Sequence, residues 1–265
     1  VLGSRGLGDV YKRQVSVDNR KISFANGPRF IGARRADRSL DQFYNHDDEK
    51  AKEKDRTYSE FPDAAVFTKL DVKQDGGDLV VTANYKLGNL DKAQWTINPS
   101  GDLALDYTYN FSGVVDLMGI RFDYPEDQVI SKRWLGAGPY RVWQNRIHGT
   151  QYDVWENDYN DPIPGETFTY PEFKGYFGDV SWMNIQTKEG TISLTNETPD
   201  AYIGVYQPRD GRDRLLYTLP ESGISVLNVI PPVRNKVNST DLCGPSSQPK
   251  WVNGPQTGRV IFRFM

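Results

Sequence analysis

The sequence contains few of the residues that build metal and disulfide sites. Its 265 residues include one cysteine, Cys243, and two histidines, His46 and His148. One cysteine excludes an intrachain disulfide and a multi-cysteine metal site, and two histidines in separate polar segments do not form a metal-binding motif. The chain also lacks a G-x-S-x-G nucleophile motif, a P-loop and a dinucleotide-binding glycine motif. We therefore expect no metal and no other cofactor.

Long apolar runs and a charge excess are absent as well. Apolar residues make up 37% of the chain, and no apolar run approaches the roughly 20 residues that span a bilayer. The net charge is -3 with both signs interspersed, and the basic residues form no stripe interleaved with aromatics. This composition favours neither a membrane nor a nucleic acid as a partner.

The N-terminal stretch differs from the rest of the chain. The segment "SRGLGDVYKRQ", Ser4–Gln14, carries three positive charges and two glycines without an apolar period, whereas short strand-like runs begin at Val15. It resembles the translation of a transposon-end adapter used in shotgun sequencing. We therefore expect residues 1–14 to be non-native and the gene to have been cut upstream of Val15. A mobile basic tail is the alternative.

Aromatic residues, by contrast, are abundant. Tyrosine, phenylalanine and tryptophan together make up 12% of the chain. Their side chains fit the half-buried surface of a β-sheet, so sheet packing explains most of them. The alternative is that some tryptophans and tyrosines stack on the apolar faces of sugar rings.

Alternation of apolar and polar residues runs through most of the chain. In "LALDYTYNF", residues 103–111, the side chains of Leu105, Tyr107 and Tyr109 fall on one face, which predicts a half-buried strand. Residues 79–87 and 258–265 repeat this period, and turn residues separate further strand-like runs at 21–25, 67–72, 93–99, 119–124, 151–157, 166–170, 180–187, 191–197, 201–207 and 223–230. We predict an all-β fold of large antiparallel sheets packed face to face, with few or no helices.

Two stretches interrupt the alternation. Residues 45–56, "NHDDEKAKEKDR", are almost wholly charged and predict a solvated loop or a short exposed helix. Residues 231–255 are rich in proline, serine, asparagine and glycine and predict a long irregular loop before the last strand. Loops of more than about 15 residues are often functional, so this loop is the second place to look for a site.

The segment "RWLGAGPYRVWQNR", Arg133–Arg146, is the first place to look for a site. Its two glycines and Pro139 favour a tight turn. The turn is followed by Tyr140 and Trp143 among guanidinium and amide side chains. An aromatic platform flanked by such donors suits a polyhydroxylated ligand. Alternatively, the same side chains hold a loop against a sheet.

Here the sequence resembles the C-terminal domain of glycoside hydrolase family 2 β-galactosidases, which has a "WxGxGPxExYxDR"-like stretch followed by a "PxExG"-like one. The matching residues are Trp134, Gly136, Gly138, Pro139, Arg146, Pro171, Glu172, Gly175 and Trp182, with Asn26 and Gly27 upstream. The resemblance implies a supersandwich of the galactose mutarotase type over residues 15–265. The candidate carbohydrate-binding residues are Arg141, Trp143, Asn145 and Arg146 in the aromatic and polar cluster, with Glu172 and Lys174 in the second stretch.

The sequence departs from the family's pattern at several positions. Arg141 and Val142 stand where the family has Glu-Asn, and Asn145 stands where it has the Asp before the closing Arg. Leu242 and Cys243 occupy the place where a tryptophan of the family's late loop is expected. These departures leave the identity of the sugar undecided, and a β-linked sugar other than galactose fits equally well.

The residues for glycosidic bond cleavage are not found in this chain. Retaining hydrolysis needs two carboxyls about 5 Å apart. In the family that the sequence resembles, both glutamates lie in a TIM barrel upstream of the supersandwich, and no βα repeat is present here. Acidic residues do cluster within 151–172, and we expect them to form a solvated rim; they are Asp153, Glu156, Asp158, Asp161, Glu166 and Glu172.

The sequence thus leads us to expect the truncated, non-catalytic C-terminal domain of a β-galactosidase-like glycosidase. Its expected partners are a carbohydrate and the upstream TIM-barrel and sandwich domains of the same polypeptide. A free-standing carbohydrate-binding or structural module is one alternative. Another is the C-terminal domain of a polysaccharide lyase, with His148 as a base near Asn145 and Arg146.

Overall fold

The computed structural model describes residues 15–17, 20–35, 58–159, 175–206, 220, 222–232 and 244–265. These residues form strands and two 3-10 turns, η2 (Glu126–Gln128) and η5 (Pro245–Ser247), with no α-helix among them. Within the same ranges no helix is long and apolar enough to cross a membrane. The all-β prediction is confirmed. The predictions for residues 1–14, 45–56 and 166–170 fall outside the described residues.

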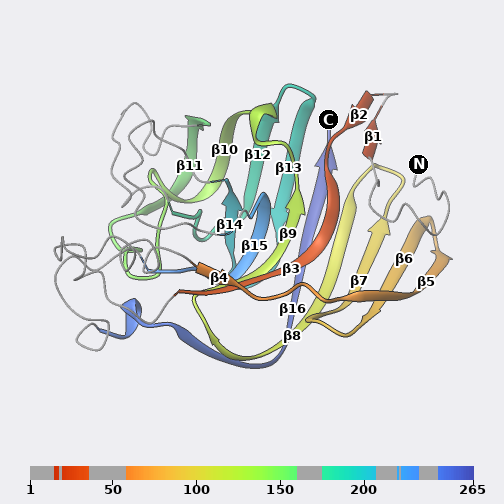
Figure 1. The fold of residues 1–265 in the computed structure, drawn as a ribbon. Coiled ribbons are helices and arrows are strands. Elements are labelled where there is room, and N and C mark those ends of the chain that lie inside the picture. Colours follow the sequence, from red (N-terminus) through yellow and green to blue (C-terminus); the bar gives the residue numbers. More distant parts are fainter. Residues whose placement is uncertain are drawn as a thin grey trace.

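The larger sheet has nine antiparallel strands in the order β11-β10-β12-β13-β16-β8-β7-β6-β5 (Figure 1). Its centre is the pairing of β16 with β8, which extends from Lys250 opposite Val115 to Phe262 opposite Leu103. In chain order the strands are β5 (Val66–Asp75), β6 (Asp78–Lys86), β7 (Leu90–Ile97), β8 (Leu103–Val115), β10 (Val129–Gly138), β11 (Gln151–Asp158), β12 (Trp182–Thr187), β13 (Gly190–Asn196) and β16 (Lys250–Phe264).

The smaller sheet has five strands in the order β14-β15-β9-β3-β4 and lies against the larger one (Figure 1). Its strands are β3 (Ala25–Arg35), β4 (Tyr58–Glu60), β9 (Leu117–Asp123), β14 (Tyr202–Val205) and β15 (Ile224–Val229). Strands β1 (Val15–Val17) and β2 (Arg20–Ile22) form a separate two-stranded sheet just before β3.

The core lies between the two main sheets and follows from the alternation in the sequence. The larger sheet contributes Leu105, Tyr107 and Tyr109 from β8, and the smaller sheet contributes Ile120 and Phe122 from β9; all are buried. Because successive side chains of a strand point to opposite faces, the intervening polar residues point outward. Aromatic rings pack against one another in this core, for example Phe24 on Phe122 at 5.0 Å and Phe122 on Phe262 at 5.1 Å.

Two boundaries differ from the sequence-based expectation. The alternation pattern misses β10, because Gly136 and Gly138 suggest a turn; both lie inside the strand. Glycine is needed there for close packing, since a Cβ at Gly138 would lie 2.4 Å from Cδ1 of Trp155. The irregular loop predicted over 231–255 also ends earlier. Strand β16 begins at Lys250, because residues 250–255 pair in register with residues 110–115 of β8.

Candidate functional site

The predicted site follows directly on β10. After Gly138 the chain turns through residues 139–146, which we call the turn segment. Its backbone pairs with itself, since the N–H of Arg146 donates to the carbonyl of Trp143 at 2.9 Å. It also pairs with the chain after the undescribed residues 160–174, because Val142 and Tyr176 exchange backbone hydrogen bonds of 2.7 and 2.8 Å. The turn segment is therefore a fixed part of the sandwich.

Trp143 is a core residue in this structure. Only 1% of its surface is exposed, and its ring meets that of Tyr176 edge-on, with centroids 5.7 Å apart. Around it lie Val142, Leu227 and Ile230, which belong to the second, smaller hydrophobic cluster. Both ring faces are thus covered by protein, so the geometry gives Trp143 a packing position rather than an open stacking platform.

Arg141 is equally buried, with 1% of its surface exposed. Its guanidinium carbon lies 4.7 Å from the ring centroid of Phe177, and its Nη1 donates to the carbonyl oxygens of Val205, at 3.2 Å, and of Tyr206. Burial lowers the pKa of Arg141 to about 10, which still leaves the group charged at neutral pH. The side chain therefore holds the end of β14 in place.

The turn segment meets the end of the second predicted site region. Gln144 Nε2 donates to the carbonyl oxygens of Ser246, at 2.9 Å, and Gln248, at 2.7 Å, and Asn145 Nδ2 donates to Ser247 Oγ at 3.2 Å. Sequence reasoning named both regions without linking them, and the fold brings them into contact. Asn145 and Arg146 are partly buried at this junction, whereas Glu172 and Lys174 lie outside the described residues.

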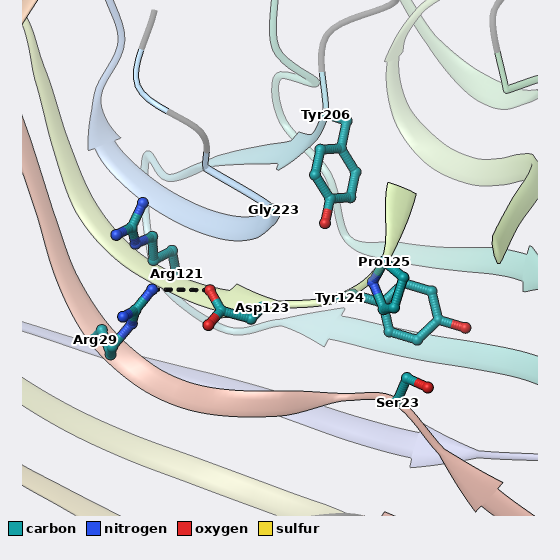
Figure 2. A pocket seen from close by; sticks show the side chains of 8 residues that line it. All are labelled: Ser23, Arg29, Arg121, Asp123, Tyr124, Pro125, Tyr206 and Gly223. Atoms are coloured by element: carbon teal, nitrogen blue, oxygen red, sulfur yellow. Dashed lines mark hydrogen bonds and ion pairs between the residues drawn. The ribbon is translucent and has the colours of Figure 1, made fainter. Parts of the chain in front are cut away.

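A second polar region, which the sequence analysis did not single out, is an open cleft on the smaller sheet (Figure 2). We call it the arginine cleft. Its volume is about 450 Å³. The residues that line it come from β3, β9 and the adjoining loops; they are Ser23, Arg29, Arg121, Asp123, Tyr124, Pro125, Tyr206 and Gly223.

The charged side of the arginine cleft is built by the pairing of β3 with β9. Arg29 lies directly opposite Arg121 in the register, and Arg29 Nη2 donates to Asp123 Oδ1 at 2.9 Å (Figure 2). Arg121 and Asp123 share one face of β9 because they are two residues apart, while Ile120 and Phe122 between and beside them enter the core. Two guanidinium groups and one carboxylate are therefore presented on the outer side of the smaller sheet.

The opposite wall is fixed by a partly buried carboxylate and its hydrogen bonds. Glu189 accepts hydrogen bonds from Ser23 Oγ at 2.6 Å, Ser23 N at 2.8 Å and Tyr124 Oη at 3.0 Å. Burial by itself would raise the pKa of Glu189, but these hydrogen bonds outweigh it and lower the pKa. Burial raises the pKa of Tyr124 to about 12, so its phenol is a neutral donor. Ser23 and Tyr124 are thereby held at the cleft.

Tyr206 connects the turn segment with the arginine cleft. Its carbonyl accepts a hydrogen bond from the buried Arg141, and its N–H donates to the carbonyl of Gly223 at 3.1 Å. The backbone of Tyr206 has φ +27°, a value that needs such support in a residue with a side chain. Arg141 thus affects the cleft indirectly, because it holds the backbone of Tyr206, whose side chain lines the cleft.

Metal-ligating side chains do not gather in the described ranges. No group of three or more His, Cys, Asp or Glu residues within them could hold a metal ion. The chemistry that the described sites offer is hydrogen bonding and ion pairing by arginine, tyrosine, amide and carboxylate groups.

Fold and sites together define a class: a two-sheet all-β domain that presents a polar, arginine- and tyrosine-lined cleft on its smaller sheet. Residues 15–242 match the family model of the β-galactosidase small chain. The chain therefore belongs to the β-galactosidase small-chain family, and the resemblance inferred from its motifs is confirmed.

One solved structure that the chain is similar to is a GalM/aldose epimerase homologue from C. elegans. The two share 8% sequence identity at a TM-score of 0.36, over 89% of this chain and 81% of that one. No curated protein sequence matches the chain at a significant level.

Proposed function

We propose that this chain is a non-catalytic domain of a β-galactosidase-like glycosidase, in which it contacts carbohydrate and packs against upstream barrel and sandwich domains of the same polypeptide. Membership of the β-galactosidase small-chain family supports the parent activity. In the whole protein the reaction would be hydrolysis of a terminal β-linked galactose or a related sugar, with both catalytic glutamates supplied by another domain.

The observation that best supports a carbohydrate-binding role is the arginine cleft. Sugar hydroxyl groups both donate and accept hydrogen bonds, so a sugar site needs donors and acceptors side by side. The cleft offers the guanidinium groups of Arg29 and Arg121, the carboxylate of Asp123 and the phenol of Tyr206. Its volume of about 450 Å³ lies within the range of small-molecule pockets, about 300–1,000 Å³.

The surroundings of the carboxylates support a non-catalytic role. The hydrogen bond from Arg263 Nε to Asp102 Oδ1, 2.7 Å long, lowers the pKa of Asp102, and the pKa of Glu189 is lowered too. Asp106 and Glu197 both pair with Arg259, at 2.6 and 2.9 Å. A general acid in glycoside hydrolysis needs a raised pKa. Asp102, Asp106 and Glu197 lie in ion pairs with arginines, whereas Glu189 is held by neutral hydrogen-bond donors.

The residues singled out in the sequence take two roles in this proposal. Arg141 and Trp143 are positioning residues, since they are buried and act on Tyr206 and on the turn segment. Asn145 and Arg146, at the junction with residues 244–248, remain candidate sugar contacts together with Glu172 and Lys174. The departure of Arg141 from the family's pattern is then a structural difference more than a change of substrate contact.

Two measurements on the 265-residue chain test the proposal. The chain is expected to release no nitrophenol from aryl β-galactosides, and clear turnover would overturn the non-catalytic assignment. In calorimetric titration with methyl β-galactoside, Arg121→Gln should weaken binding by about tenfold, because a charged hydrogen bond is lost. The matched control is Arg133→Gln, which removes an exposed arginine of β10 and should leave binding unchanged.

The alternatives make different predictions. A free-standing carbohydrate-binding module would bind the sugar equally well, but the gene region upstream of Val15 would encode no barrel. A polysaccharide lyase domain would instead bind an acidic polysaccharide and have a helical domain upstream. Sequencing upstream of Val15 therefore separates the three assignments, and a barrel there is the expected result.

A further inference from the structure

Strand β5 (Val66–Asp75) is the last strand of the larger sheet in the described part of the chain (Figure 1). All ten of its residues are exposed. They include the apolar side chains of Leu70, at 45% exposure, and Val72, at 58%. An open sheet edge of this length, with apolar residues on it, is a template for pairing with another strand.

The two faces of β5 differ in chemistry. One face carries charges of alternating sign: Lys69, Asp71, Lys73 and Asp75. The other face carries Leu70, Val72 and Gln74. Neighbouring charges pair along the strand, Lys69 with Asp71 at 2.7 Å and Lys73 with Asp75 at 3.3 Å, and all four side chains are at least half exposed. Such exposed pairs contribute little to stability, so they remain available for other partners.

The backbone of β5 is prepared for pairing over a defined span. Its register with β6 shifts between Phe67 and Lys69 and is regular from Lys69 to Asp75, where the hairpin closes through Gly76 and Gly77. In a two-residue hairpin the residues that flank the loop exchange hydrogen bonds, and every second residue does so thereafter. The backbone groups of residues 75, 73, 71 and 69 therefore form hydrogen bonds with β6. Leu70, Val72 and Gln74 direct their N–H and C=O groups to the open edge.

We propose that two copies of this chain associate through β5, antiparallel, about a two-fold axis at Val72. Val72 is the midpoint of the regular span from Lys69 to Asp75. In this register the outward-facing residues 70, 72 and 74 of one copy meet residues 74, 72 and 70 of the other and exchange hydrogen bonds. The two nine-stranded sheets become one continuous sheet, and both open edges are closed.

The charges select this register over its neighbours. With the axis at Val72, Lys69 faces Asp75 and Asp71 faces Lys73, so all four charges of each copy meet an opposite charge. An axis at Asp71 would oppose Lys69 to Lys73, a like pair. An axis at Leu70 would pair Lys69 with Asp71 but leave Lys73 opposite the irregular part of the strand at Phe67. Opposite charges directly across a strand pair stabilise it, and like charges destabilise it.

The test is sedimentation of the 265-residue chain across the micromolar range. We expect a concentration-dependent dimer that weakens with ionic strength. Lys73→Glu opposes like charges twice in the dimer and should weaken it by about tenfold or more. The double variant D71K/K73E restores all four cross-copy pairs and should recover the dimer to within about threefold. The control Lys92→Glu makes the same charge change on β7 and should have no effect.

The double variant separates pairing between copies from pairing within the strand. It places like charges beside each other along β5, at 69 with 71 and at 73 with 75, so an intrastrand role predicts further loss instead of recovery. A second variant, Val72→Pro, removes the outward N–H at the axis and should abolish the dimer with the thermal unfolding transition retained. A wild-type chain that stays monomeric throughout, or a dimer indifferent to Lys73→Glu and Val72→Pro, would overturn the proposal.

Discussion

The turn segment and the arginine cleft use similar residues for different ends. In the turn segment, Arg141 and Trp143 lie inside the sandwich, and their partners are backbone carbonyls and aromatic rings. In the cleft, Arg29 and Arg121 lie on the outer side of a strand pair, and the side chain of Asp123 beside them is partly exposed. The comparison shows that the fold decides whether an arginine beside an aromatic side chain is buried as a structural contact or left partly open to solvent. Four substitutions sharpen this contrast.

Removing the ring of Trp143 should have the largest effect. Trp143→Ala deletes a fully buried side chain and leaves a cavity among Val142, Tyr176 and Leu227, so the free energy of unfolding should fall by about 3–5 kcal/mol. Denaturant unfolding measures this loss. Trp251→Ala is the matched control, because Trp251 is 71% exposed and its loss should cost less than about 0.5 kcal/mol. If the Trp143→Ala chain kept wild-type stability but no longer bound sugar, Trp143 would be a sugar contact and not a packing residue.

Removing the guanidinium of Arg141 comes next. Arg141→Met keeps much of the volume but leaves the carbonyls of Val205 and Tyr206 without this donor, at a cost of about 2–4 kcal/mol in the free energy of unfolding. Arg121→Met in the cleft should cost less than about 1 kcal/mol. Both variants should weaken sugar binding, the first through Tyr206 and the second through lost contact. Equal stability losses at the two positions would remove the distinction.

A smaller effect is expected at the end of β10. Gly138→Ala introduces a Cβ 2.4 Å from Cδ1 of Trp155, so overpacking should reduce the free energy of unfolding by about 1–3 kcal/mol. At Gly77 the nearest neighbour of an added Cβ is Pro99 Cγ at 3.6 Å, which is an ordinary contact. Gly77→Ala should therefore be nearly neutral in the same thermal or denaturant measurement. A neutral Gly138→Ala would mean that β10 does not pack tightly on β11.

The smallest effect concerns the wall of the cleft. Glu189 has a lowered pKa, so its hydrogen bonds stabilise the fold above the pKa of the unfolded carboxyl, 4.5, and this contribution is lost as the pH falls through the folded-state pKa. Glu189→Gln should cost about 1 kcal/mol or less at neutral pH, since the group is partly solvated. The difference from wild type should shrink in acid. A difference that grows below pH 4.5 would contradict the assigned direction.

The sequence was sufficient for the fold because burial in a sandwich follows a period of two. Leu105, Tyr107 and Tyr109 can be assigned to the core from alternation alone. Strand β10 could not be found that way, because its glycines resemble a turn. The reason for them lies in distant segments, since a Cβ at Gly138 would meet Trp155 and one at Gly136 would meet the backbone of residues 178–180. The family could be named because its motif residues Trp134, Gly136, Gly138 and Pro139 are local in the sequence.

The site was harder to predict because exposure depends on contacts between distant segments. Nothing near Trp143 in the sequence reveals that Tyr176 and Leu227 will cover it. The arginine cleft was missed for the converse reason, since Arg29 and Arg121 are 92 residues apart and meet only through the register of β3 and β9. A usable signal was present: Arg121 and Asp123 alternate with Ile120 and Phe122, which places two charges together on the outer face of β9.

The most direct measurement of the central contrast is an NMR titration of the chain with methyl β-galactoside, in which the Nε–Hε signals of individual arginines are followed in one spectrum. We predict that the signals of Arg29 and Arg121 shift with a common saturation curve, while that of the buried Arg141 stays in place. A shift confined to Arg141 and the indole signal of Trp143, with Arg29 and Arg121 unmoved, would contradict it.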